Sequence, residues 1–91
     1  MSITRESAYL YLCSKELTKI NHKLHDLSKE AHKFAQKYHA ATDEKTRHKY
    51  SKKHHGVTED MRKLMKEHNA MLSRIKHHLV NFNNALRKEL K

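Results

Sequence analysis

The chain has 91 residues, a formal net charge of +10 and an apolar fraction of 36%. With no proline, one glycine and no tryptophan, it lacks the residues that build hairpins, tight turns and phosphate-cradling loops, which excludes nucleotide-binding loops and leaves helices as the regular structure. A chain of this length forms one domain with a thin core. The sequence therefore predicts an all-α protein with a single helical domain over 1–91.

The first half of the chain carries one unbroken apolar periodicity. Ten positions alternate in steps of three and four residues: Leu10, Cys13, Leu17, Ile20, Leu24, Leu27, Ala31, Phe34, Tyr38 and Ala41. Such a narrow stripe, which we call the seam, is typical of a coiled coil or a bundle member. It predicts one long helix over about 4–41. Cys13 lies on the seam, so we expect a buried, unreactive thiol and no disulfide.

The stretch 42–56 is basic, rich in histidine and poor in apolar side chains. Two interpretations stay open for it: residues 42–44 cap a separate short helix, or the first helix continues as a polar extension. Gly56 is suited to a left-handed helix C-terminus, and Thr58 followed by two acidic residues is suited to a helix start. The sequence therefore predicts a connector over 42–56 and a turn at Gly56 and Val57.

The second helix is predicted over about 58–90 and has a wider apolar face than the first. One line of positions again alternates fours and threes: Met61, Met65, His68, Leu72, Ile75, Leu79, Phe82 and Leu86. A further column flanks that line at multiples of seven residues: Val57, Leu64, Met71 and Ala85. His68 is a polar member of the line, which more often fixes register than binds a ligand.

Three apolar columns need two neighbouring helices, because one partner covers only two columns. Within the stretch 42–56 only Tyr50 is suited to burial, so this stretch cannot supply the second neighbour. The neighbour must come from another copy or another protein. We therefore expect a long helical hairpin, an antiparallel coiled coil, that forms a homodimer with the architecture of a four-helix bundle.

Three residues near the start of the first helix lie off the seam: Tyr9, Tyr11 and Leu12. They either thicken the bundle at that end or form a docking patch for a protein partner. The first functional hypothesis is therefore a small basic coiled-coil protein-interaction module, acting as an adaptor, inhibitor or structural subunit. It would act through self-association and this apolar N-terminal patch.

Basic residues outnumber acidic ones twenty to ten, and they are densest over 45–55. Lysine and arginine neutralise phosphates and release counterions, and an aromatic ring offers a stacking surface. The alternative hypothesis is sequence-independent binding of a polyanion such as DNA or RNA by this basic tip and by basic helix faces. Its candidate residues are Lys45, Arg47, Lys49, Tyr50, Lys52 and Lys53 at the tip, with Lys63, Lys66, Arg74 and Lys76 on the second helix.

Ten histidines suggest metal chemistry, but their spacing gives only a weak candidate. His22, His25 and Asp26 lie close enough on one helix to bind a divalent metal, yet three ligands do not close a site and no zinc or di-iron motif accompanies them. We expect no metal, no cofactor, no small-molecule substrate and no enzymatic activity, because the sequence shows no converging catalytic groups. No apolar run is long enough for a secretory signal or a membrane span, so we expect a cytoplasmic protein.

Overall fold

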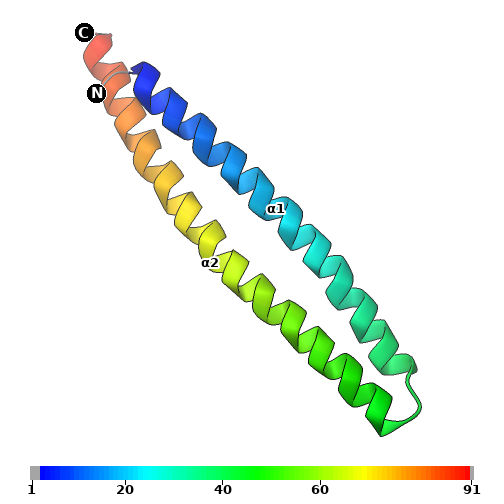
Figure 1. Cartoon of the computed structure of the whole chain (residues 1–91). Helices are drawn as coiled ribbons and strands as arrows, with labels where there is room; N and C mark the ends of the chain where they lie inside the picture. Colours follow the sequence, from blue (N-terminus) through cyan, green and yellow to red (C-terminus); the bar gives the residue numbers. More distant parts are fainter. Residues whose placement is uncertain (1–2, 91) are drawn as a thin grey trace. The chain divides into compact units, whose positions relative to one another are not determined.

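The computed structural model describes residues 3–90, which form two long helices (Figure 1). Helix α1 spans Ile3–Ala40 and helix α2 spans Glu44–Glu89. No strand occurs in the described part of the chain, which confirms the all-α prediction. None of its helices combines the length and the apolar character needed to cross a membrane. Residues 1, 2 and 91 of the predicted domain lie outside the described residues.

The two helices are joined by residues 41–43, and local hydrogen bonds explain why the chain turns there. The Asp43 carboxylate accepts a hydrogen bond at Oδ2 from the backbone N–H of Thr46 (3.1 Å), as expected of a helix N-cap. Arg47 Nε donates to the carbonyl of Ala41 (3.2 Å), which satisfies an acceptor left open where α1 ends. Hydrogen bonding from Thr46, chiefly from its side chain, lowers the pKa of Asp43.

The predicted turn at Gly56 and Val57 is wrong, because α2 continues through both residues. Gly56 has no positive φ, and one glycine in a helix interior costs only about 1 kcal/mol relative to alanine. Thr58 does not cap a new helix: its hydroxyl donates to the carbonyl of His55 (2.9 Å) inside α2. The basic stretch 45–55 is therefore neither a separate short helix nor an extension of α1, but the beginning of α2.

The chain divides into two compact units. Unit 1 combines Met1–Ile20 with Glu67–Lys91, of which 3–20 and 67–90 are described. Unit 2 is Asn21–Lys66. Unit 2 contains the end of α1, the turn and the first part of α2, so it forms a helical hairpin.

The seam of α1 is the inward-facing side of the helix in both units. Ile20 is buried in unit 1 and Ala31 is buried in unit 2, and the remaining seam positions are half-buried except Tyr38, which is 39% exposed. Cys13 is a free, half-buried thiol. The same spacing continues toward the N-terminus beyond Leu10, where Glu6 is fully buried.

On α2 the inward-facing positions differ from the predicted line. Half of that line faces inward and is half-buried: Met61, His68, Ile75 and Phe82. The column predicted to flank it is also turned inward, with Val57 and Ala85 buried and Leu64 and Met71 half-buried. The other half of the line is exposed: Met65, Leu72, Leu79 and Leu86. The predicted assignment is therefore wrong: the flanking column belongs to the inward-facing seam of α2, and the column from Met65 to Leu86 is the flank. The three apolar columns themselves are present.

Candidate functional site

Unit 1 exposes three leucines at seven-residue intervals on α2, which we call the leucine column: Leu72, Leu79 and Leu86. Their exposed fractions are 38%, 45% and 36%. Residues seven apart lie on one face of a helix, so the three side chains form a continuous apolar strip beside the seam. Removing each of them from water would contribute about 1–2 kcal/mol. The leucine column is thus an apolar surface that unit 1 does not cover.

The three residues of the predicted N-terminal patch do not lie together on one exposed surface, because Tyr9 is half-buried. The ring of Tyr9 is half-buried and stacks on His78, with ring centroids 4.8 Å apart and an interplanar angle of 24°. Tyr11 and Leu12 are 62% and 58% exposed, and Lys15 Nζ lies 5.2 Å from the centre of the Tyr11 ring. Tyr9 therefore belongs to the contact between α1 and α2 inside unit 1, and only Tyr11 and Leu12 are available to a partner.

A buried acid that the sequence analysis missed lies beside Tyr9. Glu6 is fully buried, and His78 Nδ1 donates a 2.9 Å hydrogen bond to its Oε2, while Oε1 has no hydrogen-bond partner. Such a polar pair between facing helices fixes their register. His68, the residue that the sequence suggested for this role, instead places Nδ1 3.4 Å from Oδ1 of its neighbour Asn69.

Unit 2 gathers three lysines around one aromatic ring, and we call Lys37, Lys49 and Lys53 the lysine cluster. Their Nζ atoms lie 5.5, 5.7 and 5.8 Å from the centre of the Tyr50 ring. Tyr50 also stacks on Phe34 of α1, with ring centroids 6.4 Å apart. Each cation–π contact contributes about 0.5–1 kcal/mol at an exposed site. Because Tyr50 is half-buried and stacks on Phe34, only part of its ring is open to a nucleic-acid base.

The other basic candidates are exposed but are divided between the units. Lys45, Arg47 and Lys52 lie with the lysine cluster on the first part of α2. Lys63 and Lys66 also belong to unit 2, whereas Arg74 and Lys76 belong to unit 1. Only the residues near the turn are therefore gathered in one place.

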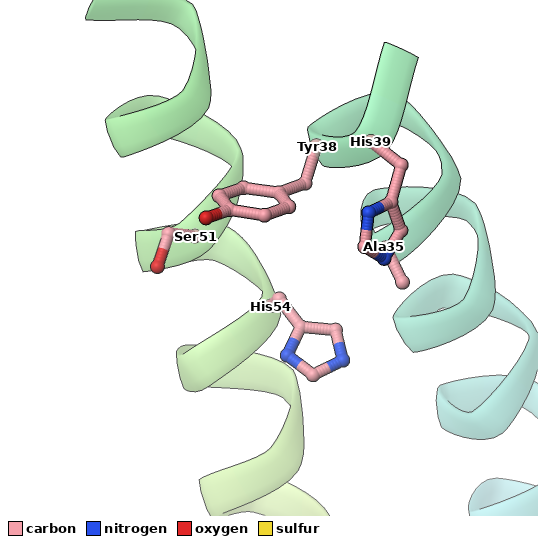
Figure 2. A pocket seen from close by; sticks show the side chains of 5 residues that line it. All are labelled: Ala35, Tyr38, His39, Ser51 and His54. Atoms are coloured by element: carbon pink, nitrogen blue, oxygen red, sulfur yellow. The ribbon is translucent and has the colours of Figure 1, made fainter. Parts of the chain in front are cut away.

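A hollow of about 230 Å³ lies in unit 2 between the two helices (Figure 2). Ala35, Tyr38 and His39 line it from α1, and Ser51 and His54 line it from α2. The phenol of Tyr38 reaches from α1 toward Ser51, and the two imidazoles lie apart from the Ser51 hydroxyl (Figure 2). No hydrogen bond among the described residues joins that hydroxyl to either imidazole, so the arrangement shown is not that of an activated nucleophile.

Two further hollows lie in the described part of the chain. One, of about 310 Å³, is also in unit 2 and is lined by Tyr38, Glu44, Arg47, His48 and Ser51. The other, of about 190 Å³, is in unit 1 and is lined by Asn81, Asn84, Ala85 and Lys88. Glu44, His48 and Ser51 share the hollow in unit 2, but no hydrogen bond among the described residues joins them into a catalytic group.

The weak metal candidates His22, His25 and Asp26 are exposed on α1. Within residues 3–90, no three histidine, cysteine or carboxylate side chains are placed to hold one metal ion. Carboxylate and imidazole ligands bind a metal only when they converge on one point. The structure therefore does not bring these three residues together as a site.

No protein-family model, curated protein or solved structure matches this chain.

Proposed function

We propose that the protein is a self-associating helical interaction module, in which the leucine column of one copy packs against a second copy to form a four-helix bundle. The observation that carries the proposal is the exposure of Leu72, Leu79 and Leu86 on one face of α2, directly beside the seam. Aligned large apolar side chains on a small protein mark a contact surface. Tyr11 and Leu12 add the docking patch for a further protein partner.

The α1 side of the same face supports a second copy as the occupant. Ser7 and Leu79 directly follow Glu6 and His78, which are hydrogen-bonded to each other. Because corresponding positions of facing antiparallel helices lie on the same side of the pair, Ser7 and Leu79 share one face. Ser14, seven residues after Ser7, continues that row. Small serines beside large leucines give a surface of ridges and grooves that a copy of itself can fill.

The proposal is tested by the molar mass of the protein in solution at micromolar concentration, measured by light scattering after gel filtration. We expect twice the chain mass of 10.9 kDa. Replacing Leu72→Glu together with Leu79→Glu should give a monomer, since each carboxylate would be buried in the interface. The matched control is Val80→Glu, an apolar-to-acidic change on the same helix, 58% exposed and off the column.

A monomeric mass for the unsubstituted protein would contradict the proposal. A double variant that stays dimeric would instead exclude the leucine column as the interface. Circular dichroism on the same samples reports whether the double variant is still helical. If it unfolds, Leu79→Ala is the second variant, and the proposal then requires a weaker dimer with unchanged helicity.

The lysine cluster favours a second candidate function, sequence-independent binding of DNA or RNA through their phosphates. Five basic side chains of the first three turns of α2 are exposed: Lys45, Arg47, Lys49, Lys52 and Lys53. Such residues neutralise a phosphate backbone without reading bases. For both functions we propose a cytoplasmic location, where the single thiol of Cys13 stays reduced.

A further inference from the structure

The lysine cluster places positive charge from two helices around one aromatic ring. Lys37 belongs to α1, while Lys49 and Lys53 belong to α2, and all three Nζ atoms lie within 5.8 Å of one ring centre. Lys53 Nζ is also 5.7 Å from the centre of the Phe34 ring. The stacked rings of Phe34 and Tyr50 therefore form the common base around which the ammonium groups are arranged.

Around the cluster, lysines stand four residues before other lysines, at positions where a glutamate would stabilise the helix. Lys45, Lys49 and Lys53 follow one another at four-residue intervals on α2, and Lys33 and Lys37 do the same on α1. Like charges at this spacing repel each other, whereas a glutamate four residues before a lysine would attract it. The arrangement thus lowers the stability of both helices, which points to a role other than holding the fold.

Among residues 3–90, no ion pair joins a carboxylate to a lysine of the cluster. The ion pairs among residues 3–90 join Lys19 to Glu16, Arg62 to Glu59 and His78 to Glu6. Asp43, at the turn, is hydrogen-bonded to Thr46. The three exposed ammonium groups are therefore open to an anion from solution.

Resting on the second candidate function and specifying its site, we propose that the lysine cluster is a phosphate-binding site of unit 2. An ammonium group binds phosphate as a compact point charge, and several of them around one position suit an oligophosphate or a phosphodiester backbone. Phe34 stacks on the Tyr50 ring and the lysines lie around it, so we expect the ligand to be recognised by its phosphates and not by stacking of a base. The site lies in unit 2 and does not depend on self-association through the leucine column.

The experiment is a titration with sodium tripolyphosphate at near-physiological salt, followed by calorimetry and by NMR of the lysine ammonium signals. We expect saturable binding that shifts the signals of Lys37, Lys49 and Lys53. Lys53→Gln should weaken binding by about tenfold, and Lys37→Gln should do the same from the other helix. The matched control is Lys76→Gln, which removes the same charge from an exposed position of α2 in unit 1 and should change the affinity less than twofold.

Two results would overturn the site. Equal weakening by Lys53→Gln and Lys76→Gln would show attraction by the net charge alone, and the absence of saturable binding would show that no site exists. Tyr50→Leu is the second variant, since it removes the ring but keeps every charge. It should weaken tripolyphosphate binding several-fold, and unchanged binding would contradict the aromatic base of the site.

Oligonucleotide probes distinguish the two sources of phosphate. A labelled oligothymidylate and an abasic oligomer of the same length should bind equally and compete with tripolyphosphate. Tighter binding of both oligomers than of tripolyphosphate assigns the site to a nucleic-acid backbone, and the reverse order assigns it to free oligophosphate. Binding that needs the bases and is unaffected by Lys53→Gln would overturn the proposal. The molar mass of the same samples reports self-association separately.

Discussion

Unit 1 and unit 2 share one alternation of inward-facing positions but differ in where they place polar and apolar side chains. Unit 1 buries a charged side chain, Glu6, and leaves the leucine column exposed. Unit 2 has no buried charged group among its described residues, and it surrounds Ala31 and Val57 with exposed lysines. The seam therefore determines how the helices pair, whereas the positions beside it carry the two surfaces that we propose for binding: the leucine column in unit 1 and the lysine cluster in unit 2.

The largest effect on stability is expected from removing the polar pair of unit 1. His78→Ala leaves the buried Glu6 carboxylate without its hydrogen-bond donor and removes the ring stacked on Tyr9. An unsatisfied buried polar group costs about 1–3 kcal/mol. We expect the free energy of unfolding to fall by that amount, measured by urea denaturation with circular dichroism as the signal.

The control for His78→Ala replaces both members of the polar pair, so that the seam of unit 1 becomes apolar like that of unit 2. In the double variant Glu6→Leu with His78→Leu, neither partner is left unsatisfied, and replacing both members of a buried pair is often neutral or stabilising. We expect it to be at least as stable as the unsubstituted protein. A double variant less stable than His78→Ala would mean that the polar pair stabilises unit 1 outright.

A smaller effect of opposite sign is expected in unit 2 from Gly56→Ala. Gly56 lies in the interior of α2, and a Cβ added there would meet no atom within 4 Å. Alanine should therefore raise the free energy of unfolding by about 0.5–1 kcal/mol, because it restricts the unfolded chain and favours the helix. Urea denaturation is again the measurement, and a loss of stability would contradict a helical Gly56.

The smallest effect is expected at the turn of unit 2, where the Asp43 carboxylate is fully exposed to solvent. Hydrogen bonds from Thr46 lower the pKa of Asp43 in the folded protein. The stabilisation by this carboxylate is therefore present above the unfolded-state pKa and is lost as pH falls through the folded-state pKa. Asp43→Ala should lower Tm by a few degrees at neutral pH and by less in strong acid.

Asp43→Asn is the matched control for the turn. Asparagine caps helices as well as aspartate does but has no carboxylate to titrate. Its Tm difference from Asp43→Ala should therefore be the same at neutral and acidic pH. Thermal unfolding followed by circular dichroism measures both variants, and a pH-independent effect of Asp43→Ala would contradict the role of the carboxylate.

The α1 helix was predictable because a single alternation of threes and fours specifies it. The prediction over about 4–41 agrees with the observed Ile3–Ala40 to within one residue at each end. Glu6 was missed although it falls on the same alternation, four residues before Leu10. A charged residue looks like the end of an apolar stripe, and only the structure shows that His78 satisfies it.

The start of α2 was not predictable from residue preferences alone. Gly56 followed by Thr58 has the local features of a helix stop and start, but the cap at Asp43 and the Arg47 hydrogen bond to Ala41 fix the turn thirteen residues earlier. That position decides which residues of α2 face α1. In unit 1 the inward position of His78, paired with Glu6 of α1, leaves the neighbouring Leu79 exposed, and the sequence of α2 alone does not reveal this pairing.

The sequence predicts the kind of surface at each candidate site but not all of the residues that form it. The excess third column of α2 indicates an uncovered apolar surface from sequence alone, and the structure shows which column it is. The basic stretch points to Lys49, Tyr50 and Lys53, but not to Lys37, which lies on α1. Only the turn at 41–43 brings Lys37 and Phe34 opposite Tyr50.

The position of the turn also sets the lengths of the loops that the chain must close to form each unit. Phe34 and Tyr50 are separated by sixteen residues, whereas Glu6 and His78 are separated by 72. Closing the longer loop from the unfolded chain costs about 1.3 kcal/mol more conformational entropy than closing the shorter one. We therefore expect unit 2 to form before unit 1 during folding.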